Sequence, residues 1–300
     1  MPTVAMVGTG RMGSAMARAL ARGGATLVLH NRSLDTARSL ADKLGATVAA
    51  TPREAAEQAD VAITMLADGN AVRATWDGPE GLVAGAHEGG ILADSSTVPP
   101  DTIGMFATAV RDRGSGILDT PVSGSTMLAE QGQLTIMAGG TVEDLDLARP
   151  ALDLMARQVT HVGPLGSGAA LKLAVNALIF AINNSVSEAL VLAEEAGLDR
   201  ATAYDVFASS AAGAPFVQYK RGSFVDPDGT PVAFSIDLAL KDLDLIIGLA
   251  DRLGVPMDQS RVNREIIGAS AGRIGGDRDM SAVAVHLRER IGEGTATTRS

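Results

Sequence analysis

Residues 3–13 read TVAMVGTGRMG, and they give the strongest indication of how the amino-terminal half of the chain folds. A run of strand-forming residues leads directly into the pattern G-x-G-x-x-G, and a helix-like segment opens behind it. In that context Gly8 makes a tight turn, Gly10 lets the backbone approach a pyrophosphate, and Gly13 allows close packing of helix on strand. A plain strand-to-helix turn is the alternative. The predicted dinucleotide contacts in this loop are Gly8, Thr9, Gly10, Arg11, Met12 and Gly13.

The end of the second predicted strand indicates which dinucleotide is bound. An acidic residue about 20 positions beyond the glycine motif would bind the ribose 2′-hydroxyl of NAD. This chain has Asn31, Arg32 and Ser33 there instead. An amide, a guanidinium and a hydroxyl suit a 2′-phosphate. The sequence therefore favours NADP, with an ordinary surface charge as the alternative role of Arg32.

Strand-like and helix-like segments alternate through the first half of the chain, at intervals of about 20 to 30 residues. Repeated βα units of this kind predict a parallel sheet, and right-handed crossovers make it doubly wound. The predicted strands are residues 3–7, 26–30, 61–66, 90–93, 116–118, 134–137 and 159–162.

The pattern changes after residue 164. Residues 167–197 form one long apolar helix without a breaker, and the helices predicted after it are residues 200–211, 235–253, 258–270 and 281–291. The fold class is therefore α/β: an amino-terminal Rossmann-type sheet plus an all-helical carboxy-terminal domain joined by a long interdomain helix. The predicted divisions are residues 1–164 for the dinucleotide, 165–291 for substrate and dimerisation, and 292–300 as a flexible tail.

Composition and charge argue against several classes of protein. The 300 residues include 35 acidic and 25 basic side chains, and the net charge of −10 disfavours nucleic acid or an anionic membrane as partner. There is no cysteine and the four histidines lie far apart, so we expect neither a disulfide nor a metal site. No signal-like segment precedes the first strand, which predicts a cytoplasmic protein. The long apolar helix predicts a homodimer or homotetramer.

One of the four lysines lies in that apolar helix. Lys172 and Asn176 are one turn apart and share a helix face, which Asn183 and Ser187 continue. An ammonium there is costly unless it is paired or lines a wet cleft, and burial lowers the pKa of a lysine toward the range useful for proton transfer. Lys172 is therefore a catalytic candidate, and a lysine snorkelling from the helix edge is the alternative.

Two loops that follow predicted strands have the composition of binding loops. Residues 119–126 read DTPVSGST, and their small hydroxyls and glycine can present N–H groups and a serine hydroxyl to a carboxylate. A surface turn is the alternative there. Residues 94–97 read DSST and follow another strand at its carboxyl end, where open α/β sheets bind ligands.

Together these motifs resemble the β-hydroxyacid dehydrogenase family, which includes 3-hydroxyisobutyrate dehydrogenase and the glyoxylate/succinic semialdehyde reductases. The resemblance covers roughly residues 2–290, with the motifs in the family's order. VGTGRMG at residues 7–13 is similar to the cofactor motif, and DTPVSG at residues 119–124 to the substrate-binding motif. GPLGSG at residues 163–168, continuing to Lys172 and Asn176, is similar to the catalytic motif.

The resemblance implies a reaction and the residues that perform it. A small carboxylate substrate, a β- or γ-hydroxy acid or its semialdehyde or keto acid, would exchange a hydride with NADP(H) while Lys172 acts as general acid or base. The helical domain would be of the 6-phosphogluconate dehydrogenase kind. The implied substrate contacts are Ser123, Gly124, Asn176, Phe234 and Asp242. The other implied cofactor contacts are Met65, Leu66, Thr97 and Lys241. The remaining lysines, Lys43 and Lys220, are expected at the surface.

The chain also departs from the family pattern in its substrate loop. Thr120, Ser125 and residues 127–128 are bulkier than the family's usual residues. We expect them to line the carboxylate end of the site, which would favour a substrate with an alkyl portion over tartronate semialdehyde. Two other functions remain open: an imine reductase on the same fold, which would often have another residue in place of Lys172, and a non-enzymatic NADPH-binding sensor or scaffold.

Overall fold

We describe the protein from a computed structural model, which describes residues 1–297 and their side chains as far as Ile291. The chain divides into two compact units, Met1–Lys172 and a second that begins at Leu173. They meet within helix α8 (Ser167–Glu195), whereas the predicted boundary falls after residue 164. The first turn of α8 is bonded to a carboxylate of the first unit, as shown below, and this explains the difference.

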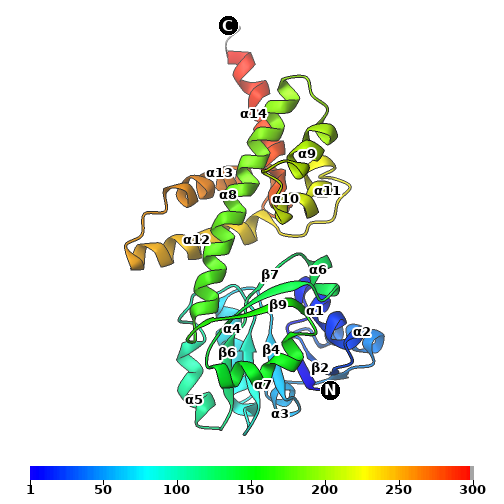
Figure 1. Ribbon diagram of the computed structural model, residues 1–300, viewed down its shortest axis with the longest axis vertical. Coiled ribbons are helices and arrows are strands. Elements are labelled where there is room, and N and C mark those ends of the chain that lie inside the picture. The colour runs from blue at the N-terminus through cyan, green and yellow to red at the C-terminus, as the bar shows by residue number, and fades with distance from the viewer. Residues whose placement is uncertain (298–300) are drawn as a thin grey trace. The chain divides into compact units, whose positions relative to one another are not determined.

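A single sheet forms the centre of the first unit (Figure 1). Its strands are β1 (Thr3–Val7), β2 (Thr26–His30), β3 (Thr47–Val48), β4 (Val61–Thr64), β5 (Ile91–Asp94), β6 (Gly116–Asp119), β7 (Val122–Ser123), β8 (Leu134–Gly139) and β9 (Ala156–Gly163). They lie in the order β3-β2-β1-β4-β5-β6-β8-β7, and β9 pairs with β8. All pairs from β3 to β6 are parallel, as predicted.

The predicted parallel arrangement does not extend to β8, which runs antiparallel to β6 and β7. β3 and β7 were not predicted, because two residues each are too few to show an alternating pattern.

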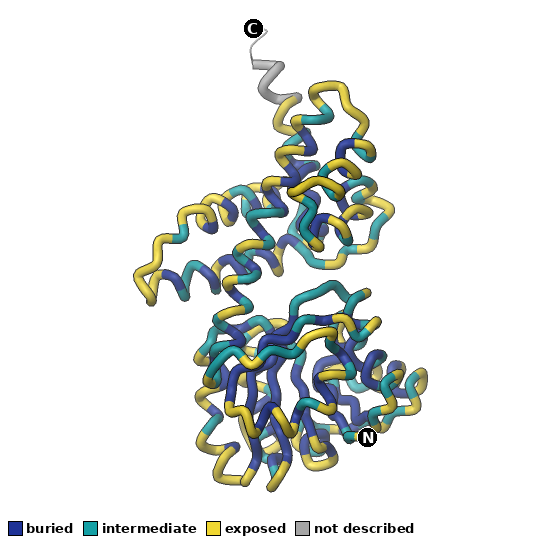
Figure 2. Tube along the Cα trace, in the orientation of Figure 1, coloured by how far each residue is buried: buried dark blue, intermediate teal, exposed yellow. Residues whose placement is uncertain are grey.

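The central strands of this sheet are buried on both faces (Figure 2). Alternate residues of β1 point to opposite faces: Val4 and Met6 pack in one core, and Ala5 and Val7 in the other. The helices of this unit are α1 (Arg11–Arg22), α2 (Leu34–Leu44), α3 (Pro52–Glu57), α4 (Gly69–Trp76), α5 (Ala107–Arg111), α6 (Thr126–Glu130) and α7 (Val142–Leu152), with short 3₁₀ turns at Leu82–Gly85 and Gly104–Phe106. Because α1 and α2 contribute to one core and α3 and α4 to the other, the sheet is doubly wound.

The second unit is helical and packs around α8. Leu173, Phe180 and Leu190 of α8 lie in its core. The other helices are α9 (Arg200–Ser209), α10 (Pro215–Tyr219), α11 (Arg221–Val225), α12 (Ile236–Leu253), α13 (Asp258–Ile274), the 3₁₀ turn Met280–Ala282 and α14 (Val283–Thr297). The side chains of residues 292–297 and all of residues 298–300 lie outside the described part of the chain, so the flexible tail stays a prediction.

The long helix α8 meets the length and apolarity expected of a membrane span, a test that a core helix also passes. Its polar residues are bonded within the second unit: Asn183 Nδ2 donates to the carbonyl oxygen of Met280 at 3.0 Å, and Asn184 Nδ2 to Oδ1 of Asn263 at 3.0 Å. These bonds show that α8 serves as the packing helix of this unit.

Candidate functional site

The strand order places a ligand site at the carboxyl ends of β1 and β4. The chain leaves β1 toward β2 on one side and returns as β4 on the other, and open α/β sheets bind ligands at such a switch point. The glycine loop follows β1 and Met65 follows β4. A Cβ on Gly8 would overlap the carbonyl oxygen of Met65, so these two loops are in close contact.

Two of the three motif glycines are required by packing within the protein. Gly8 has φ +98°, which L side chains rarely adopt, and a Cβ on Gly13 would overlap the carbonyl oxygen of Gly8. These contacts bring the start of α1 directly against the end of β1. The predicted tight turn and close helix–strand packing are both present.

The third motif glycine faces open space, which fits a phosphate group. Gly10 is the N-cap of α1, and a Cβ added to it would meet nothing within 4 Å. No side chain caps this helix and its first turn has no acidic residue, so its N–H groups and dipole can receive an anion. Beside it, Thr9 Oγ1 is buried without a hydrogen-bond partner among the described residues. The residues present therefore fit the pyrophosphate of a dinucleotide.

The loop after β2 is tied to the glycine loop. Asn31 Oδ1 accepts from the N–H of Thr9 at 3.2 Å, and its Nδ2 donates to the carbonyl oxygen of Ser33 at 3.2 Å. Arg32 is exposed between them. The next acidic residue, Asp35, lies on α2 and pairs with Arg38 at 2.9 Å. This edge of the site thus carries an exposed cation and no carboxylate at the strand end.

The predicted contacts after β4 and β5 are joined by a buried hydrogen-bond chain. The N–H of Leu66 donates to Ser96 Oγ at 2.9 Å, and Ser96 Oγ donates to Oδ1 of Asp94 at 2.7 Å. Thr64 Oγ1 donates to the same oxygen at 2.5 Å. Burial raises the pKa of Asp94 to about 6, although both hydroxyls oppose the shift. These hydrogen bonds hold Leu66 beside the segment that carries Thr97.

Asp119, at the end of β6, anchors the helix that carries Lys172. Its carboxylate accepts from the N–H groups of Gly166 at 2.7 Å and Ala169 at 2.6 Å. Burial raises the pKa of Asp119, and these N–H groups oppose the shift. Gly168 lies so close that a Cβ there would stand 2.8 Å from Oδ2 of Asp119. The first turn of α8 is thereby held to the sheet one turn before Lys172.

Sequence reasoning missed this role of Asp119. It selected residues 119–126 for their hydroxyls and N–H groups, which left the acid at the head of the motif without a function. The available signal was an acidic residue at a strand end in a chain with a glycine-rich helix start, GPLGSG, further along.

Lys172 is half-buried on α8, and Asn176 is buried one turn further along the same face. Asn176 Nδ2 donates to Oδ2 of Asp242 at 2.7 Å. Lys241 Nζ lies 2.9 Å from Oδ1 of the same carboxylate, an ion pair that lacks hydrogen-bond geometry. Asp242 is only 1% exposed. Its carboxylate contacts both side chains, and the role of Asp242 as a substrate contact stays a prediction.

The segment of residues 119–128, predicted to bind the substrate, matches that prediction only in part. Ser123 is half-buried in β7, and Gly124 has φ +143°, which requires glycine. Thr120 is fully buried and bonded to Ser95 Oγ at 3.0 Å, so the expectation that it lines the site is wrong. Ser125 caps α6 by accepting from the N–H of Leu128 at 3.2 Å. Met127 is exposed and can still line the loop.

Phe234, just before α12, is half-buried, and its ring centroid lies 6.2 Å from that of Phe180 on α8. The expectation that Lys220 is a surface residue is wrong, because it is 3% exposed and paired with Asp279. The signal available in the sequence was that lysine is scarce among the basic residues of this chain. Lys43 is exposed, as expected.

Two family models match almost the whole chain. The NAD binding domain of 6-phosphogluconate dehydrogenase matches residues 3–163. A model described as NAD-binding of NADP-dependent 3-hydroxyisobutyrate dehydrogenase matches residues 166–287. The two matches meet at the start of α8.

Individual proteins agree with these matches. The chain is 34% identical to 3-sulfolactaldehyde reductase of Escherichia coli (strain K12), over 97% of this chain and 98% of the relative. A structure of Mycobacterium tuberculosis 3-hydroxyisobutyrate dehydrogenase with L-serine has TM-score 0.82 and 31% identity, covering 96% of this chain and 99% of that one. Psf3 in complex with NADP⁺ and 2-OPP has TM-score 0.85 and 26% identity, over 95% of this chain and 100% of that one.

The fold and the glycine loop define a nucleotide-dependent oxidoreductase with a Rossmann-type unit and a helical unit. More narrowly, the chain belongs to the β-hydroxyacid dehydrogenase family, and it is an NAD(P)-dependent enzyme of that family. An imine reductase from Pseudomonas sp. aligns with TM-score 0.64 at 19% identity, which shows a shared fold only. The named relatives are enzymes, which disfavours the non-enzymatic alternative.

Proposed function

We propose that this enzyme uses NADP(H) to interconvert a small acid-bearing aldehyde or keto acid and its β- or γ-hydroxy acid, with Lys172 as general acid and base. The observation that carries the proposal is the anchoring of α8. Asp119 accepts from the N–H groups of Gly166 and Ala169, which fixes the turn that precedes Lys172. Asn176 follows one turn later on the same face, suited to bind the substrate.

In the reductive direction, NADPH when bound supplies the hydride that reaches the carbonyl carbon. The Lys172 ammonium donates one proton to the carbonyl oxygen, so the product is a neutral hydroxyl and a neutral amine that regains its proton from solvent. In the oxidative direction the amine of Lys172 removes the hydroxyl proton. Ser123 and the N–H groups around Gly124 are the proposed partners of the substrate's acid group.

The proton-transfer role is tested by Lys172→Ala in an NADPH oxidation assay. Loss of a general acid is expected to lower kcat by about 100-fold to 10,000-fold. Lys43→Ala is the matched control, because Lys43 is exposed on α2. Unchanged turnover of Lys172→Ala would remove Lys172 from the mechanism.

The NADP preference rests on Arg32, which is exposed at the end of β2 where no carboxylate stands. Arg32→Glu is expected to weaken NADPH binding by about 10- to 100-fold, the value of a hydrogen bond to a charged group, and to leave NADH binding unchanged or improved. Arg38→Glu, on the exposed face of α2, is the control. Equal loss for both cofactors would contradict the preference.

The substrate class is tested by a screen of aldehyde acids of increasing chain length, with 3-sulfolactaldehyde and cyclic imines as further arms. We propose a substrate with an alkyl portion, since Met127 is exposed on α6, the helix that follows Ser123 in the chain. Best activity on the two- or three-carbon acids would overturn this preference. Turnover of imines alone would replace hydroxy acid chemistry by imine reduction.

We also propose a cytoplasmic homodimer or homotetramer. Leu178 and Leu192 of α8 are exposed, and apolar side chains of this size are normally covered in an assembly. Light scattering at several protein concentrations tests the oligomeric state.

A further inference from the structure

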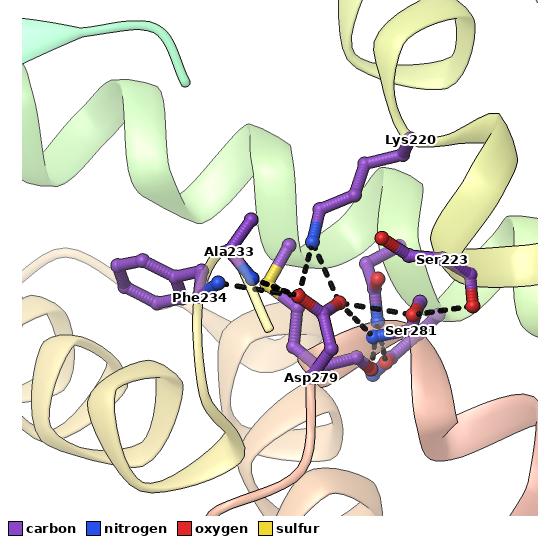
Figure 3. Close-up of polar contacts among 9 residues, drawn as sticks. Lys220, Ser223, Ala233, Phe234, Asp279 and Ser281 are labelled. Carbon is purple, nitrogen blue, oxygen red and sulfur yellow. Dashed lines mark hydrogen bonds and ion pairs between the residues drawn. The ribbon is translucent and has the colours of Figure 1, made fainter. Parts of the chain in front are cut away.

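The second unit contains a buried ion pair that the proposed reaction does not use. Lys220 Nζ lies 2.6 and 2.7 Å from the two carboxylate oxygens of Asp279, and both side chains are buried (Figure 3). Burial lowers the pKa of Lys220 although Asp279 opposes the shift. Burial alone would raise the pKa of Asp279, but Lys220 and the hydrogen bonds the carboxylate accepts hold it below its usual value. Burying such a pair costs free energy, which further hydrogen bonds to the two side chains can offset.

Asp279 also binds the main chain that leads into α12. Its Oδ2 accepts from the N–H of Ala233 at 2.9 Å and from that of Phe234 at 3.2 Å. Its Oδ1 accepts from the N–H and hydroxyl of Ser281 at 3.1 and 2.9 Å. The carbonyl oxygen of Phe234 accepts from the N–H of Met280 at 2.9 Å. Both polar groups of the Phe234 main chain are therefore fixed by residues 279 and 280.

The side chain of Phe234 points away from this network, as Figure 3 shows. Its ring packs on Phe180, at a centroid distance of 6.2 Å and an interplanar angle of 38°. Phe180 lies one turn beyond Asn176 on α8. Asn183, further along that helix, donates to the carbonyl oxygen of Met280 at 3.0 Å. The network thus fixes Phe234 against the face of α8 that carries Asn176.

We infer that Lys220 and Asp279 are positioning residues of the substrate site, which hold Phe234 against Phe180. The inference rests on the proposed function, in which Asn176 binds the substrate, and on Phe234 as the substrate contact that the family resemblance implies. Within the described part of the chain, the Lys220 ammonium donates two hydrogen bonds, both to Asp279, and Asp279 acts through the N–H groups of Ala233 and Phe234. The pair keeps two N–H donors and one aromatic ring in place through a carboxylate whose charge Lys220 balances.

The first test is steady-state kinetics of Lys220→Met, which keeps the length of the side chain and removes its charge. We expect KM for the aldehyde or keto acid to rise about 10- to 100-fold, the effect of a misplaced binding group. We expect kcat and NADPH affinity to stay nearly unchanged, because binding common to ground and transition states is lost. Arg221→Met is the control: the neighbouring cation pairs with Asp205 at the surface. A lower kcat with unchanged KM would overturn the inference.

A double-mutant cycle with Phe234→Ala separates positioning from general stability. If Lys220 acts through Phe234, the double variant has the KM of Phe234→Ala alone. KM effects that multiply would overturn the inference. If Lys220→Met does not fold, Asp279→Asn enters the same cycle, because it keeps one acceptor oxygen and loses the charge.

Amide hydrogen exchange tests the placement without any substrate. Exchange at Ala233 and Phe234 is expected to quicken in Lys220→Met or Asp279→Asn and to stay unchanged in Arg221→Met. Unchanged exchange in all variants would overturn the inference. If the wild-type enzyme reduces none of the acids, the proposed function fails, while the exchange result still decides whether the pair holds this segment.

Discussion

The two units each bury a carboxylate that holds a residue of the proposed site, and they stabilise it differently. In the first unit, Asp119 accepts from N–H groups at the start of α8, and burial still raises its pKa. In the second, Asp279 is paired with Lys220, and its pKa is lowered. Main-chain dipoles compensate a buried charge only in part, whereas an ammonium at contact distance makes the charged form the stable one. The two anchors should therefore respond differently to mutation and to pH.

Removing each carboxylate tests this difference between the two anchors most directly. Asp279→Ala leaves the Lys220 ammonium buried without its partner, and we expect the free energy of unfolding to fall by about 3–5 kcal/mol. Asp119→Ala leaves only neutral N–H groups unpaired, at about 1–3 kcal/mol. Urea unfolding monitored by circular dichroism measures both. Equal losses would mean that the two carboxylates are stabilised alike.

The pH dependence of stability distinguishes Asp279 from a third buried carboxylate, Asp94, whose pKa is raised by burial to about 6. A carboxyl group whose pKa is raised by folding contributes stability while it is protonated. This contribution is complete below the pKa of the unfolded state, near 4, and is lost as pH rises through 6. The free energy of unfolding of Asp94→Asn, relative to that of the wild type, should therefore rise by about 3 kcal/mol between pH 4 and pH 8. Asp279 has the opposite sign: its contribution is present at neutral pH and is lost as pH falls through its lowered pKa.

The control for this measurement is Asp35→Asn, because Asp35 is exposed on α2. A difference between Asp94→Asn and wild type that stays constant from pH 4 to 8 would show that Asp94 does not titrate in this range.

The anchoring of α8 is tested by kinetics of Asp119→Asn. Its amide presents an N–H₂ group to one of the two N–H donors, so the turn before Lys172 should shift. We expect kcat to fall about 10- to 100-fold, with NADPH affinity unchanged because β4 and β5 lie between β6 and β1, the strand that leads into the glycine loop. Asp112→Asn, exposed after α5, is the control. A full kcat in Asp119→Asn would show that the α8 anchor does not affect Lys172.

The smallest expected effect compares two glycines of one loop. Gly10→Ala places its Cβ in open space, so the melting temperature should stay unchanged while the dissociation constant for NADPH rises about tenfold. Gly13→Ala pushes its Cβ into the carbonyl oxygen of Gly8 and should lower stability. Titration of NADPH fluorescence and thermal unfolding separate the two. A destabilised Gly10→Ala would mean that this glycine is structural.

The predicted and observed folds agree where the signal is local. The strands of the parallel part other than β3 were predicted from short strand-forming runs between helix-like segments, and the long helix α8 from its unbroken apolar run. β8 was predicted as a strand, but its antiparallel direction was not, because its residues do not show which neighbouring strand it pairs with. Lys220 was misplaced for a similar reason: its partner is 59 residues away in the chain.

The class of protein can be inferred from the sequence alone, since a glycine loop, a strand before it and a helix after it are encoded within about a dozen residues. Lys172 and Asn176 can be selected in the same way, because helical spacing puts them on one face. Which carboxylates hold that face in place becomes visible in the folded structure. Asp119 meets Ala169 across 50 positions, and Asp279 meets Phe234 across 45. The strength of such contacts depends on burial and distance in space, which no local spacing specifies.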